Sequence, residues 1–151
     1  MIKVLFICHG NICRSPMAEY IFKKLIKDAG IEESFEVDSA ATSREEIGND
    51  IYPPAKKCLK EHGIPFDVHS ARQITKQDVE YYDYIIAMED YNINNLERKF
   101  GQSYKFKRLL DFTDTPRNIS DPWYTGDFET AYAEIEKGCR AFLEEINGEP
   151  K

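Results

Sequence analysis

Apolar residues recur along the chain in two patterns, one typical of buried strands and one typical of amphipathic helices. Residues 3–8, Lys-Val-Leu-Phe-Ile-Cys, form a near-continuous apolar run, which is typical of a strand buried on both faces of a parallel sheet. From Ala18 onward, apolar residues return every three or four positions, as on one face of a helix, and Gly30 is a natural stop. Ser15 is a good N-cap and Pro16 suits the first helical position, so we expect the helix to begin there.

The same alternation continues along the rest of the chain. We expect, in order, a strand at 35–37, a helix at 54–62, a short helix capped by Thr75, a strand at 84–88, a helix at 90–100, a strand at 106–110 and a helix at 127–146. This order predicts an α/β fold of three layers, with a central, mostly parallel sheet of about four strands flanked by helices. Residues 111–126 form one long loop, and loops of that length are often functional.

Length, composition and charge narrow the class of protein. A chain of 151 residues with 42% apolar residues fits one compact domain, 1–151, and we expect only the last few residues to be flexible. The net charge is −7 without a block of Lys or Arg, which argues against nucleic acid and against an anionic membrane as partners. No apolar run is long enough to be a signal or membrane segment. We therefore expect a cytoplasmic protein whose four cysteines are reduced.

The segment that follows the first predicted strand carries candidate chemistry. Cys8 and Arg14 are separated by five residues. They lie between the end of the predicted strand and the start of the predicted helix, where α/β proteins with a parallel sheet bind their ligands and where the helix presents unpaired N–H groups. A helix N-terminus and a nearby cation stabilise a thiolate, so Cys8 is a candidate nucleophile. Gly10 and Asn11 tolerate a positive φ, which suits a tightly curled anion-binding loop. The Arg14 guanidinium can grip two phosphate oxygens.

Metal chemistry is not needed for this interpretation. Phosphoryl transfer depends mainly on positioning and on stabilisation of charge, so we expect no metal and no cofactor in catalysis. As zinc ligands, Cys8 and Cys13 do not match the usual spacing, because no second Cys or His pair accompanies them.

Residues 4–19, Val-Leu-Phe-Ile-Cys-His-Gly-Asn-Ile-Cys-Arg-Ser-Pro-Met-Ala-Glu, resemble the opening of low-molecular-weight protein tyrosine phosphatases. Similarity continues in four further segments: 38–42, 71–76, 82–85 and 121–124. The resemblance implies a single domain with four parallel strands and the hydrolysis of phosphotyrosine, and of small aryl phosphates, through a cysteinyl-phosphate on Cys8. It also implies that Asp121 protonates the leaving phenolate and then acts as general base on water.

Supporting roles follow from the same resemblance. The substrate-binding loop would comprise His9, Gly10, Asn11, Ile12, Cys13 and Ser15, with the Ser15 hydroxyl directed at the Cys8 thiolate. Asn11, Ser39 and His69 would form a hydrogen-bond network that holds the loop. Cys13 resembles the family's second loop cysteine, which can pair with the nucleophile under oxidant, so we expect redox sensitivity.

Two aromatic residues are candidates for the walls of the pocket. Trp123 and Tyr124 can stack on a flat phosphotyrosine ring. Trp123 stands where animal members of the family commonly have the first of two adjacent tyrosines. The opposite wall, near Glu45, lacks an aromatic residue that some relatives have. Phosphotyrosine proteins or peptides, and inorganic phosphate or similar oxyanions in the loop, are the expected partners of a monomeric enzyme.

Three other functions compete with this interpretation. An arsenate reductase of the same fold relays oxidation through further cysteines, but residues 76–100 contain none. Protein arginine phosphatases tend to carry threonine at the position of Ile12, and apolar Ile12 favours an aromatic phosphoester. A cysteine phosphocarrier also places a cysteine after the first strand, but it has no need of the acid that Asp121 would supply.

Overall fold

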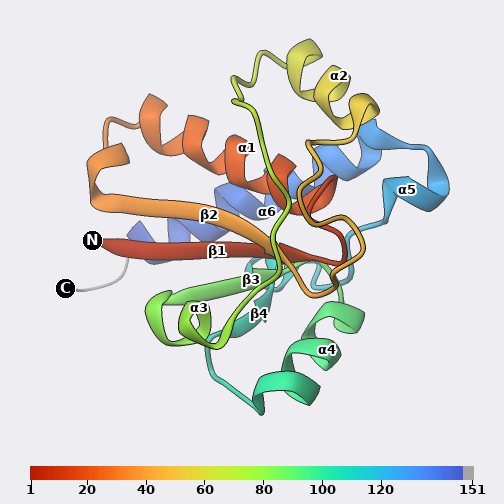
Figure 1. Ribbon diagram of the computed structural model, residues 1–151. Helices are drawn as coiled ribbons and strands as arrows, with labels where there is room; N and C mark the ends of the chain where they lie inside the picture. Colours follow the sequence, from red (N-terminus) through yellow and green to blue (C-terminus); the bar gives the residue numbers. More distant parts are fainter. Residues whose placement is uncertain (148–151) are drawn as a thin grey trace.

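The computed structural model describes residues 1–147, and these build a three-layer α/β domain (Figure 1). Our expectation about the flexibility of the last few residues concerns 148–151, which lie outside the described part of the chain. The elements run in the order β1 (Ile2–Cys8), α1 (Arg14–Asp28), η1 (Glu32–Ser34), β2 (Phe35–Ala41), α2 (Pro53–Glu61), α3 (Lys76–Tyr81), β3 (Tyr84–Ala87), α4 (Asp90–Phe100), β4 (Phe106–Arg108), η2 (Leu109–Phe112), α5 (Pro122–Thr125) and α6 (Phe128–Asn147).

The four strands form one parallel sheet, as predicted, and their order in the sheet is β2-β1-β3-β4. β1 is central, and its successive side chains enter two separate cores. Val4 and Phe6 pack under α1 and α6, whereas Leu5 and Ile7 face α3 and α4. This burial on both faces explains why β1 is apolar without interruption from Val4 to Cys8 instead of alternating.

Most element boundaries agree with the sequence pattern because local signals specify them. Thr75 caps α3 through a reciprocal bond with Asp78, and Gly101 ends α4 with a φ of 84°. Gly30, at φ 71°, follows the end of α1. Each of these residues supplies a hydrogen bond or a backbone conformation that most other residues cannot.

Several predicted boundaries are wrong. α1 begins at Arg14, with Cys13 as its N-cap, because the Ser15 hydroxyl contacts Cys8 instead of capping the helix. β2 continues four residues beyond the predicted end at 37, and β4 stops at Arg108, where the chain turns into η2. The predicted loop 111–126 contains the short helix α5.

Within residues 1–147, no helix combines the length and the apolar character needed to span a membrane.

Candidate active site

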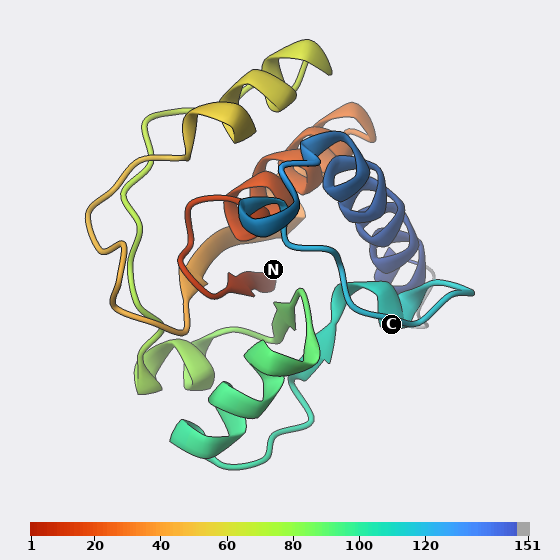
Figure 2. The same cartoon turned by 90° about the vertical axis from the view of Figure 1, so that its right-hand side faces the viewer.

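The chain between β1 and α1 lies at the carboxyl edge of the sheet, which Figure 2 shows end-on, with α5 next to the start of α1. We call residues 8–15 the Cys8 loop. Asn11 has a φ of 61°, the left-handed conformation that asparagine tolerates. Gly10 does not share this conformation. A Cβ at Gly10 would lie 3.2 Å from Cγ of Glu46, so close packing against that side chain, and not a positive φ, explains the glycine.

Two donors face the sulfur of Cys8, which is only 4% exposed. The Ser15 Oγ lies 3.0 Å from Sγ, and the backbone N–H of Asn11 donates to Sγ over 3.3 Å. Because the Asn11 side-chain amide already donates to the Ser15 Oγ over 2.8 Å, the hydroxyl proton is free to point at the sulfur. The loop therefore directs two hydrogen-bond donors at the position where a thiolate would sit.

A buried network holds Asn11 in place. Its side-chain amide also donates to the Ser39 Oγ over 3.0 Å, and the Ser39 hydroxyl donates to the Glu19 carboxylate over 2.6 Å. His69 donates through Nε2 to the Asn11 carbonyl over 2.6 Å. Asn11, Ser15, Ser39 and Glu19 are each at most 4% exposed, so each bond replaces water that these groups cannot reach. The structure thus places Ser39 and His69 in contact with Asn11 of the Cys8 loop, as the resemblance implied.

Arg14 is 2% exposed and is held by three oxygen acceptors. Its guanidinium donates to the Glu89 carboxylate over 3.0 Å, to the Ile119 carbonyl over 2.9 Å and to the Asp121 carboxylate over 3.3 Å. Burial opposes its positive charge, but the negative charge of Cys8 and the bonds to Glu89 and Asp121 outweigh that and raise the pKa of Arg14. A permanent cation is therefore fixed beside the Cys8 loop.

Asp121, in the segment 111–126, lies beside Arg14 and the Cys8 loop. It is the N-cap of α5, because one of its carboxylate oxygens accepts the backbone N–H of Trp123 over 3.1 Å. The other oxygen is the one that contacts Arg14. The cap fixes the carboxylate of Asp121 at the hollow that Cys8 also lines.

The hollow has a volume of about 120 Å³. Its lining residues are Cys8, His9, Gly10, Ile12, Cys13, Arg14, Glu45, Glu46, Asp121, Trp123 and Tyr124. We call Glu45, Glu46, Trp123 and Tyr124 the rim. The rim aromatics are open to solvent, with Trp123 50% and Tyr124 84% exposed. All the predicted catalytic residues and pocket walls therefore line one hollow.

Cys13 and His9 complete the lining. Cys13 is buried, and burial, together with the negative charges of Cys8 and Asp121, raises the pKa of its thiol. His9 bonds through Nε2 to the Glu45 carboxylate over 2.8 Å, and its ring lies 5.9 Å from that of Tyr91. Cys13 is therefore a thiol beside the nucleophile, and His9 links the Cys8 loop to the rim.

Several residues of the site had escaped the sequence analysis. Glu89 is a partner of Arg14 and lies in no motif, and Glu19, the partner of Ser39, ends the segment 4–19 but was assigned no role there. Tyr52 packs on Trp123, with ring centroids 4.8 Å apart, and so supports the rim from α2. Tyr52 is the N-cap of α2, and only its proximity in space to Trp123, not its sequence position, gives it this role.

Comparison with known proteins agrees with this geometry. The family model described as "Low molecular weight phosphotyrosine protein phosphatase" matches residues 3–151. The human protein of that name is 48% identical, over 96% of this chain and 96% of its own length. The crystal structure of YfkJ from Bacillus subtilis is 42% identical, with a TM-score of 0.95, and covers 100% of this chain and 98% of that one.

The fold is also shared with a protein named for a different activity. The crystal structure of a Drosophila arginine phosphatase is 31% identical, with a TM-score of 0.89, over 99% of this chain and 100% of that one. The family model, however, matches residues 3–151, and both the sequence comparison and the structure comparison find members of that family. This chain belongs to the low molecular weight phosphotyrosine protein phosphatase family.

Proposed function

We propose that this chain is a protein tyrosine phosphatase that works without a metal, with Cys8 as nucleophile, Arg14 as phosphate clamp and Asp121 as general acid and base. The observation that carries the proposal is the convergence of these three side chains on one hollow of about 120 Å³. All three residues line this hollow, and the guanidinium of Arg14 contacts the Asp121 carboxylate over 3.3 Å. Family membership supports the reaction class, and the geometry supports the assignment of residues.

In the first step, the Cys8 thiolate attacks phosphorus. The S–P bond forms as the bond between phosphorus and the tyrosine oxygen breaks, and Asp121 gives its proton to the departing phenolate. Arg14 and the backbone N–H groups of the Cys8 loop stabilise the charge on the phosphoryl oxygens. Because this charge is met by fixed donors, little reorganisation is needed during transfer.

In the second step, water releases the phosphoryl group. Asp121, now a carboxylate, accepts a proton from water as the new O–P bond forms and the S–P bond breaks. The Ser15 hydroxyl and the Asn11 N–H, which face Sγ, stabilise the thiolate that leaves. Inorganic phosphate is the product, and Cys8 and Asp121 return to their starting states.

The walls of the hollow favour an aromatic phosphoester. Ile12 lines the hollow as an apolar side chain, and the exposed aromatic residues Trp123 and Tyr124 line it as well. A phenyl ring can stack between such groups, whereas the guanidinium of a phosphoarginine gains nothing from Ile12. We therefore propose phosphotyrosine proteins or peptides as substrates, with small aryl phosphates also accepted.

We further propose that inorganic phosphate and similar oxyanions bind in the Cys8 loop and inhibit competitively. We propose that the enzyme acts as a monomer in the cytoplasm and that Cys13, beside Cys8, allows reversible oxidation.

The proposal is tested by measuring phosphate release from a phosphotyrosine peptide in the presence of a metal chelator. We expect wild-type turnover to be unaffected by the chelator and to fall to background in Cys8→Ser. The matched control is Cys139→Ser, since Cys139 is a buried cysteine on α6 outside the hollow. Turnover that persists in Cys8→Ser, or that is lost with the chelator, would overturn the proposal.

A further inference from the structure

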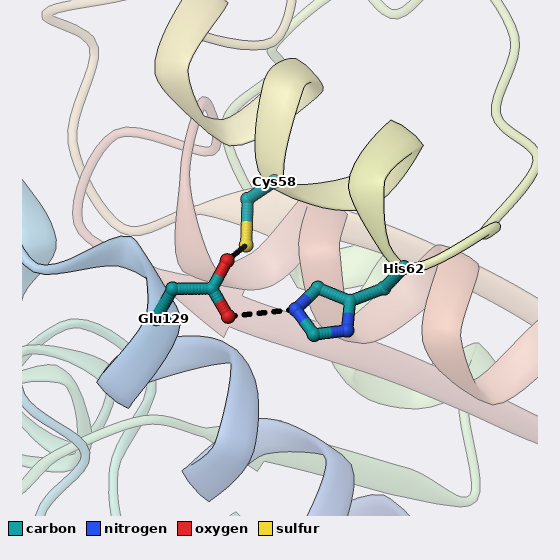
Figure 3. Close-up of side chains that lie close together, drawn as sticks. All are labelled: Cys58, His62 and Glu129. Carbon is teal, nitrogen blue, oxygen red and sulfur yellow. Dashed lines mark hydrogen bonds and ion pairs between the residues drawn. The ribbon is translucent and has the colours of Figure 1, made fainter.

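Three potential metal ligands converge between α2 and α6, away from the hollow (Figure 3). Cys58 lies on α2, and His62 follows one turn later at the end of that helix. Glu129 lies in the first turn of α6. The three ligand atoms all lie within 4.8 Å of one another, and Figure 3 shows both α2 side chains pointing at the Glu129 carboxylate.

We propose that Cys58, His62 and Glu129 bind a divalent zinc ion that links α2 to the start of α6. A thiolate, an imidazole and a carboxylate are the three ligand types that zinc uses in proteins. The soft sulfur selects against magnesium and calcium, which prefer oxygen ligands. Three protein ligands leave one position for water, and this position faces solvent because His62 and Glu129 are partly exposed.

The distances between the ligand atoms are close to those that a tetrahedral ion requires. Bond lengths typical of zinc place a sulfur and an oxygen ligand about 3.6 Å apart, and a nitrogen and an oxygen ligand about 3.3 Å apart. The Cys58 Sγ lies 3.6 Å from the Glu129 Oε1. The His62 Nε2 lies 2.7 Å from the other carboxylate oxygen, Oε2. To admit the ion, the carboxylate must therefore turn one oxygen toward both partners, and its distance to the imidazole nitrogen must grow by about half an ångström.

The imidazole is already oriented for such a site. The His62 ring stacks on the Tyr132 ring with centroids 3.7 Å apart and planes 10° apart. Tyr132 belongs to α6, as Glu129 does, so one helix both orients the histidine and supplies the carboxylate. Side-chain contacts that fix a ligand in this way raise metal affinity.

Binding requires the loss of one proton. Burial and the negative charges of Glu129 and Glu61 raise the pKa of the Cys58 thiol to about 12, so without metal the sulfur is protonated and donates toward Glu129. When zinc binds, the S–Zn bond replaces the S–H bond and the proton leaves to solvent. No electron transfer takes place, and the neutral imidazole and the carboxylate each contribute a lone pair.

The experiment must separate this site from the Cys8 thiol, which also binds soft metals. The host protein is therefore the full chain carrying Cys8→Ser, titrated with zinc chloride and followed by calorimetry and by thermal unfolding. We expect one equivalent to bind. At a zinc concentration 100-fold above the dissociation constant, the melting temperature should rise by about 5–10 °C.

Ligand variants in that host decide the location. Cys58→Ser and His62→Gln should each weaken zinc binding at least tenfold. The matched control, Cys139→Ser, should bind as the host does, since Cys139 bonds to the Ala18 carbonyl instead and is not one of the three ligands. His62→Gln also guards against misfolding, because His62 is partly exposed and a polar replacement is tolerated there.

Cobalt gives an independent readout of the sulfur ligand. The host protein with Co²⁺ should show the absorption of a thiolate–cobalt bond, and Cys58→Ser should lose it. Failure of the host to bind zinc would overturn the proposal. So would zinc binding that changes less than twofold in both Cys58→Ser and His62→Gln.

Discussion

The Cys8 loop and the rim line the same hollow but are built in opposite ways. In the loop, Cys8 and Arg14 are almost fully buried, and each is held by partners that are themselves fixed. On the rim, Trp123 and Tyr124 are at least half exposed. The loop is preorganised for one phosphoryl group, which every substrate shares, whereas the rim meets parts of the substrate that vary. This difference predicts large effects on catalysis from the loop and small effects on binding from the rim.

Asp121 connects the two regions, so its loss should have the largest effect after that of Cys8 itself. Asp121→Asn keeps the α5 cap, since asparagine caps as well as aspartate, but it cannot exchange a proton. We expect kcat to fall by about 10²–10⁴ with little change in KM. The loss should shrink for aryl phosphates whose phenol is strongly acidic, because such a leaving group needs no protonation. An equal loss for all leaving groups would contradict the role of general acid.

Arg14→Lys should reduce kcat by about 10²–10³, because a lysine ammonium cannot bond to two phosphate oxygens in the fork geometry of a guanidinium. It also leaves Glu89 and the Ile119 carbonyl short of a donor. The matched control is Arg98→Lys on the exposed side of α4, which should retain full activity. Steady-state kinetics on a phosphotyrosine peptide check this, and an active Arg14→Lys would show that the clamp is not required.

Ser39→Ala tests whether the network beneath the loop positions it. The change removes the acceptor for Asn11 and the donor to the buried Glu19, which should lower the free energy of unfolding by about 1–3 kcal/mol. We also expect kcat to fall while KM stays nearly constant, because the loop amides lose their alignment. Thr130→Ala, which removes an exposed hydroxyl-carboxylate contact, is the control in denaturant unfolding. Unchanged kcat in Ser39→Ala would mean that the network only stabilises the fold.

The smallest effect is expected from the rim. Tyr124→Ala should raise KM for a phosphotyrosine peptide by about 2–10-fold and leave kcat unchanged, as stacking of aromatic rings contributes about 0.5–1.5 kcal/mol. Tyr104→Ala is the control, since Tyr104 is 83% exposed and lies outside the hollow. A fall in kcat comparable to that of Arg14→Lys would erase the distinction between rim and loop.

The sequence predicted the sheet and the Cys8 loop because both depend on local signals. β1 is apolar from Val4 to Cys8, and Cys8 and Arg14 lie at fixed places on either side of one turn. Ser15 was misassigned as an N-cap because a hydroxyl at that position has two possible uses, and only the position of the Cys8 sulfur decides between them. Gly10 was predicted to adopt a positive φ because glycine does so readily. Its actual constraint is the close approach of Glu46, which is distant in the sequence and leaves no local signal.

Partners that come from far along the chain could not be predicted. Glu89 meets Arg14 from the end of β3, 75 residues away, and a single glutamate carries no pattern. The Cys58 and His62 pair did carry a signal, one helical turn apart in a predicted helix, but the sequence analysis weighed only Cys8 and Cys13 as zinc ligands. Glu129, which completes that group, becomes visible only when α6 is packed against α2.

The central claim, that Cys8 carries the phosphoryl group, is tested most directly by trapping the intermediate. The enzyme is mixed with a phosphotyrosine peptide whose phosphoryl group is radiolabelled, quenched within milliseconds in denaturant, and digested for analysis of the labelled fragment. We predict up to one equivalent of label on the fragment that contains Cys8, and none in Cys8→Ser. Turnover with no label on the protein, or label on any other residue, would contradict the account.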